Sequence, residues 1–100
     1  MNEDDRAYYA RREFDEWHAE IMRRLHVLNT EGVRVPLGGD AGSVAVSPFG
    51  HVLDVRLDRR NIEYLAERAL ADYLVAAIET AQREAQQAQR RLVHTKWEEH

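Results

Sequence analysis

The sequence predicts a single α+β domain with a long N-terminal helix, a three-stranded antiparallel meander and a long C-terminal helix. The hydrophobic period supports this fold class, because apolar residues recur every three or four positions, then every second position, and then every three or four again. One hundred residues with no cysteine leave room for one core and exclude a disulfide scaffold, a thiolate metal site and a cysteine nucleophile. We therefore expect residues 1–100 to form one domain.

The first helix is expected from about Asp5 to Asn29. Its large apolar side chains fall on one stripe, at Phe14, Trp17, Ile21, Leu25 and Leu28. On the other faces, Arg12 and Glu16 and also Glu20 and Arg24 are four positions apart, which brings their side chains together on a helix. Glu31 and Gly32 supply a stop. Residues 1–5 are acidic and are expected to be flexible.

Three strands are expected between Val33 and Asp58, where apolar residues alternate with others. The alternating residues are Val33, Val35 and Leu37, then Val44 and Val46, then Leu53, Val55 and Leu57. Turn-forming stretches at residues 38–42 and 47–50 separate them, so consecutive strands should pair antiparallel. Because Pro36 has no N–H to donate, the first strand is expected at an edge.

After Asp58 the chain has no proline or glycine, and strong helix formers dominate as far as His100. One uninterrupted helix is the prediction, with Asp58 or Asn61 as its cap. A heptad-like seam runs along it at Ile78, Ala81, Ala85, Ala88, Leu92 and Thr95. Residues 95–100 are expected to fray.

The expected lengths of the two helices favour association of the chain with a second copy. A helix of about 33 residues is roughly 50 Å long, whereas a compact 100-residue protein has a radius of gyration of about 13 Å. The apolar stripe and the alanine seam would then be partly exposed in one chain, so we expect an intertwined or sheet-joined homodimer that covers them. The candidate interface residues from this argument are Phe14, Trp17, Ile21, Ile78, Ala81 and Ala85.

Residues 42–58, GSVAVSPFGHVLDVRLD, combine a G-x-V-x-V strand, a glycine-bearing turn and a strand that ends in an acidic residue. Residues 76–83, AAIETAQR, form an alanine-rich helical stretch. These segments, in this order, resemble the YbaB/EbfC family of bacterial nucleoid-associated proteins. The resemblance covers about residues 8–92 and rests on the order of elements more than on any single motif.

This resemblance implies a homodimer whose sheets join and whose helices project as arms. It implies low-specificity binding to double-stranded DNA in the cytoplasm and nucleoid, with effects on nucleoid organisation or gene expression. Joined sheets add Leu53 and Val55 to the candidate interface. The chain departs from the family pattern in its acidic start and in Trp17 and Trp97. Some proteins of this shape are encoded beside type VII secretion genes, so the alternative is a dimeric adaptor that binds a protein partner instead of DNA.

The net charge of −4 opposes DNA binding, but basic residues gather locally. Residues 83–96 hold four bases against Glu84, and Arg12 and Arg23 share a helix face about 16 Å apart along the axis. The candidate DNA-binding residues are Arg11, Arg12, Arg23, Arg24, Arg83, Arg90, Arg91 and Lys96. Alternatively, these arginines pair with nearby acids on a solvated surface. One continuous positive face favours DNA, whereas arginines interleaved with acids around an exposed aromatic patch favour a protein partner.

The sequence contains no motif of catalytic or cofactor chemistry. Its five histidines form no i, i+4 pair, and neither a phosphate-binding glycine loop nor a nucleophile elbow occurs. No apolar stretch approaches the roughly 20 residues of a membrane-spanning helix. We therefore expect a non-enzymatic cytoplasmic protein with no catalytic residues, no cofactor, no metal and no membrane partner.

Overall fold

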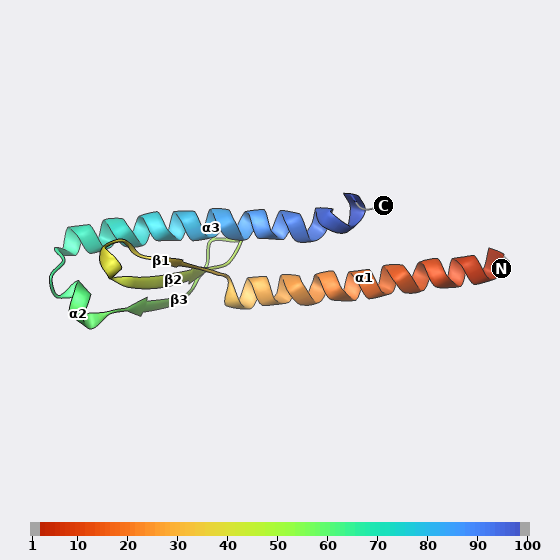
Figure 1. Ribbon diagram of the computed structural model, residues 1–100, viewed down its shortest axis with the longest axis horizontal. Helices are drawn as coiled ribbons and strands as arrows, with labels where there is room; N and C mark the ends of the chain where they lie inside the picture. The colour runs from red at the N-terminus through yellow and green to blue at the C-terminus, as the bar shows by residue number, and fades with distance from the viewer. Residues whose placement is uncertain (1–2, 99–100) are drawn as a thin grey trace.

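The computed structural model describes residues 3–98, with side chains from residue 10 to residue 94. Its elements are α1 (Glu3–Glu31), β1 (Val33–Pro36), η1 (Gly38–Asp40), β2 (Gly42–Val46), β3 (Val52–Leu57), α2 (Arg59–Ile62) and α3 (Glu67–Glu98). Figure 1 shows α1 and α3 running in opposite directions, with the sheet at one end of the molecule and both termini toward the other. The predicted α+β order of helix, antiparallel sheet and helix is confirmed.

The molecule is elongated, with extents of 71 × 19 × 17 Å. Its radius of gyration is 19.8 Å, well above the roughly 13 Å of a compact chain of this length. The elongation arises because the long helices extend beyond the sheet (Figure 1). A single chain therefore has a large exposed surface relative to the size of its hydrophobic core.

Helix α1 ends where the sequence predicted a stop. The Gly32 N–H donates to the Leu28 carbonyl at 2.9 Å, and Gly32 has a φ of +67°, a conformation that favours glycine. A Cβ at this position would lie 2.4 Å from the Val46 carbonyl oxygen, so a larger residue would also clash. At its other end α1 begins at Glu3, within the acidic start of the chain, and residues 1–2 of that start lie outside the described residues.

The sheet has the order β1-β2-β3, and both strand pairs are antiparallel. Val35, Val44 and Val55 lie side by side across the three strands, and the next row contains Arg34, Ala45 and Asp54. Apolar and polar rows therefore point to opposite faces of the sheet. Strand β1 lies at an edge, which confirms the position expected from Pro36.

The prediction of one uninterrupted helix after Asp58 was wrong, because α2 and α3 are separate. The Asp58 side chain caps α2 by accepting from the Arg60 N–H at 3.0 Å, and Asn61 Nδ2 donates to the Asp40 carbonyl at 2.8 Å. The Asn61 bond ties α2 to the turn before β2, and residues 63–66 then redirect the chain so that Leu65 packs against the core. Helix α3 continues to Glu98, and residues 99–100 of the tail that was expected to fray lie outside the described residues.

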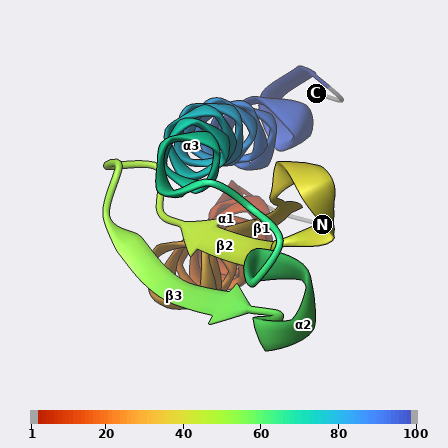
Figure 2. The ribbon, with the colours of Figure 1, turned by 90° about the vertical axis from the view of Figure 1, so that its left-hand side faces the viewer.

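Helix α3 covers one face of the sheet, over β1 and β2 (Figure 2). The core beneath it consists of Leu37, Ala41, Val44, Val46, Ala77 and Ala81. Ala81 and Ala85 are both 0% exposed, so they offer no surface to a second chain and are removed from the candidate dimer interface. The physical reason is that alanine side chains are small, so the alanine seam allows α3 to pack close against the sheet of the same chain.

Candidate nucleic-acid interface

Three of the four candidate arginines on α1 are engaged by glutamates on the same helix. Arg12 Nε donates to Glu16 Oε1 at 3.2 Å, and the two expected i, i+4 pairs, Arg12–Glu16 and Glu20–Arg24, are both present. Arg11 is exposed and makes no ion pair with a described residue. The arginines of α1 are therefore interleaved with acids and do not form a purely positive face.

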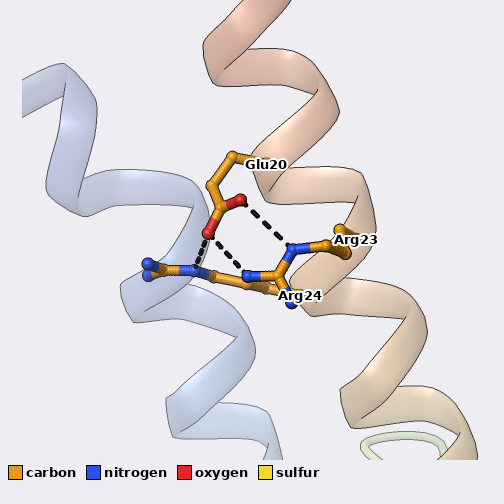
Figure 3. A network of polar contacts seen from close by, with 3 residues as sticks. All are labelled: Glu20, Arg23 and Arg24. Atoms are coloured by element: carbon orange, nitrogen blue, oxygen red, sulfur yellow. Dashed lines mark hydrogen bonds and ion pairs between the residues drawn. The ribbon is translucent and has the colours of Figure 1, made fainter.

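Glu20 holds two arginines at once, as Figure 3 shows. Its carboxylate accepts from Arg24 Nε at 2.7 Å, from Arg23 Nη2 at 2.8 Å and from Arg23 Nε at 3.2 Å. The hydrogen bonds from Arg23 and then the one from Arg24 lower the pKa of Glu20 to about 2. All three side chains are accessible to solvent, so this network remains open to exchange with other anions.

The candidate arginines on α3 are arranged differently. Arg83 and Arg90 are exposed, and they are seven residues apart, which places them on the same side of the helix about 10 Å apart along its axis. Neither makes an ion pair with a residue that the structure describes. Arg91 is also exposed, and Lys96 lies outside the residues with described side chains. Arg83 and Arg90 thus present positive charge that no ion pair with a described acid neutralises.

Sequence reasoning missed a third arginine network, on the face of the sheet away from α3. Arg34 on β1 reaches across β2 to Asp54 on β3 and also donates to Ser43 Oγ at 2.8 Å. Arg56 Nε donates to Asp54 at 3.1 Å, and the hydrogen bond from Arg34 is the main reason that the pKa of Asp54 is lowered. The alternation of charged and apolar residues in the strands placed these residues on one face but did not show their pairing.

The aromatic end of α1 is partly open to solvent. Phe14 is 51% exposed, and its ring lies 5.7 Å from Trp17 and 6.0 Å from His18, measured between ring centroids. Trp17 and Ile21 are half-buried, as is Ile78 on α3. An exposed aromatic group therefore lies on the same helix as the Arg12–Glu16 pair.

The other candidate interface residues lie on β3, where Leu53 and Val55 are exposed. Of the eight candidate interface residues, six thus keep accessible surface, while Ala81 and Ala85 do not. Among the described residues, no three histidine, aspartate or glutamate side chains come together in a way that could hold a metal ion. None of the described helices combines the length and apolar character needed to cross a membrane.

Comparison of the chain with protein-family models, with curated proteins and with solved structures gives no match. The likeness to YbaB/EbfC proteins therefore rests on the residues and on the order of the elements alone.

Proposed function

We propose that this protein is a homodimer that binds double-stranded DNA through phosphate contacts with little sequence preference and so affects nucleoid organisation or gene expression. The observation that carries the proposal is the pair Arg83 and Arg90, which are exposed, lie on one side of a long helix and have no ion-pair partner among the described residues. Guanidinium groups suit phosphate because they donate several hydrogen bonds in one plane.

The binding energy in this mechanism comes mainly from counterion release. Each phosphate that an arginine neutralises frees condensed cations, so affinity falls steeply as salt rises. Such contacts set the position of a protein on the duplex but do not distinguish bases. The predicted outcome is weak, salt-sensitive affinity that is nearly equal for duplexes of different sequence.

Apart from Arg11, the candidate arginines of α1 can add to this contact only if they exchange partners. Arg12 and Arg23 both face solvent, and their bonds to Glu16 and Glu20 are exposed ion pairs, which contribute little to stability. A DNA phosphate can therefore compete with these glutamates for the guanidinium groups. The acids reduce the attraction of α1 for DNA, which agrees with a weak binder.

The second candidate function is a dimeric adaptor that binds a protein partner in place of DNA, with a link to type VII secretion as one setting. The interleaving of arginines with glutamates on α1, next to the exposed Phe14, favours this alternative. The two helices thus support different functions, because Arg83 and Arg90 on α3 have no ion-pair partner among the described residues whereas Arg12, Arg23 and Arg24 on α1 are paired with glutamates.

Titration of a fluorescent random-sequence duplex with the protein distinguishes the two functions. Binding that is lost when Arg83 and Arg90 are replaced supports DNA as the ligand. Binding that is absent at low salt rejects the DNA proposal and leaves the adaptor as the function to pursue.

A further inference from the structure

Phe49 lies in the turn between β2 and β3, and it is 66% exposed. Contact of a phenylalanine ring with water is unfavourable, because aromatic side chains are among those that gain most free energy from burial. Figure 1 shows that this turn reaches α3 near the middle of the helix. The exposed ring is therefore carried on the part of the surface that α3 also forms.

The backbone of this turn is held in place by hydrogen bonds. Ser47 is buried, and its Oγ accepts from the backbone N–H groups of Phe49 at 3.3 Å and His51 at 3.2 Å. Gln86 Nε2 donates to the Pro48 carbonyl at 3.4 Å, which joins the turn to α3. A ligand that covers the exposed ring would therefore not have to order the turn first, and this lowers the cost of binding.

Arg83 lies on α3 at the level of the turn. Gln82 and Gln86 meet the turn on one side, since a Cβ on Gly50 would lie 2.8 Å from Gln82 Nε2. Arg83 follows Gln82 and lines a shallow surface depression together with Glu79, Gln82 and Gln86. An exposed aromatic ring and a guanidinium group with no ion pair to a described acid thus occur at the same height along α3.

We propose that Phe49 is a wedge that inserts between stacked base pairs of double-stranded DNA while Arg83 binds a phosphate nearby. The inference deepens the proposed function and rests on it for the identity of the ligand. Proteins that contact the minor groove often insert an apolar side chain between base steps, and phenylalanine is one of the residues that they use. Every base offers a face for stacking, so the wedge is compatible with low sequence preference.

The charge of the chain explains why an apolar contact is needed. The arginines of α3 favour a polyanion, but the net charge is −4, and Glu79 lines the same depression as Arg83. Phosphate contacts from Arg83 and Arg90 therefore act against repulsion from the acids of the chain. An inserted ring adds a stacking contribution that does not depend on net charge. With it, an acidic chain binds a duplex more tightly than its arginines alone allow.

The substitution Phe49→Ala tests the wedge, because it removes an exposed ring and no charge. We expect duplex affinity at about 50 mM salt to fall about 5- to 100-fold, the range that loss of one stacked aromatic side chain produces. The slope of log affinity against log salt should stay unchanged, because the number of phosphate contacts is the same. The matched control is Tyr64→Ala, which removes a ring that is 88% exposed in the turn between α2 and α3 and should bind like the wild type.

A short duplex that contains 2-aminopurine gives a second readout, because the fluorescence of this base rises when it is unstacked. At saturating protein, we expect the wild type and Y64A to raise the fluorescence and F49A to leave it nearly unchanged. Circular dichroism of both variants checks that the fold is kept.

Three results would overturn the wedge while leaving DNA binding in place. They are equal affinity of F49A and the wild type, equal losses in F49A and Y64A, and no rise in 2-aminopurine fluorescence with saturating wild-type protein. A wild-type chain that does not bind the duplex at all would reject the proposed function, and the wedge with it. The failure of the inference and the failure of the proposed function are therefore distinguished by whether the wild type binds.

Discussion

Glu20 Oε1 accepts a hydrogen bond from Arg24 Nε at 2.7 Å, and the same carboxylate also binds Arg23. One carboxylate thus binds two of the arginines that the sequence indicated as candidates for DNA contact. In a duplex complex, phosphate oxygens would have to take the place of this carboxylate. Glu20 is therefore an internal competitor of the proposed ligand.

Replacement of Glu20 by glutamine is expected to strengthen duplex binding. The change frees Arg23 and Arg24 for phosphate while the side chain keeps nearly the same size. Two added phosphate contacts would steepen the slope of log affinity against log salt by about 1.8 for each bound chain. Fluorescence anisotropy at several salt concentrations measures both the affinity and this slope.

Glu13→Gln is the matched control, because Glu13 lies on the same helix and makes no ion pair with a described residue. Both variants remove one negative charge from α1. If E13Q increases affinity as much as E20Q does, only the net charge matters, and the role assigned to the Glu20 network is wrong.

The same network predicts a pH dependence of stability. The pKa of Glu20 is lowered from 4.5 to about 2 in the folded chain, so its contribution is complete above about pH 4.5 and is lost as the pH falls toward 2. We expect the wild type to melt at a slightly higher temperature than E20Q at pH 7, and the difference to shrink between pH 4.5 and 2. Thermal melts of both proteins over this range measure it, and a constant difference would contradict the assignment.

Replacement of Ala81 by leucine is expected to lower the free energy of unfolding by about 1–3 kcal/mol. Ala81 has no exposed surface and packs in the core that α3 forms with β2, so the added carbons have no space. Ala76→Leu, at an exposed position of the same helix, should stay within about 0.5 kcal/mol of the wild type. Urea unfolding distinguishes the two, and equal stability would return Ala81 to the list of interface candidates.

Replacement of Arg83 and Arg90 together by glutamine is expected to weaken binding to all duplexes about equally. The loss of two phosphate contacts reduces the slope of log affinity against log salt by about 1.8 for each bound chain. The matched control replaces Arg59 and Arg60 on α2, which are exposed and lie at the other end of α3 (Figure 1). Equal losses in the two double variants would show that the contact is not on α3, and a loss confined to one sequence would refute the nonspecific mechanism.

The fold was largely predictable because its signals are local. The stripe that ends at Leu28, the stop at Gly32 and the alternation that begins at Val33 lie within a few residues of each other, and the structure follows them. The break between α2 and α3 was not predictable in this way. It depends on Asn61 reaching Asp40, a residue 21 positions away, and no glycine or proline marks it.

The candidate site was predictable only in part. The spacing of Glu20 and Arg24 indicated their ion pair, since i, i+4 partners meet on any helix. The packing partner of the alanine seam could not be predicted, because the same spacing is compatible with contact to a second chain and with contact to the sheet of the same chain. The ion pair between Arg34 on β1 and Asp54 on β3 spans the strand β2 that lies between them. It therefore depends on the register of both strand pairs, which the sequence alone does not give.

The most direct test of the proposed function is the anisotropy of a labelled random-sequence duplex titrated with the wild-type protein at about 50 and 200 mM salt. The proposal predicts binding at the lower salt that weakens by more than an order of magnitude at the higher, because several phosphate contacts are lost with their counterions. Absence of binding at 50 mM, or affinity that does not change with salt, would contradict it.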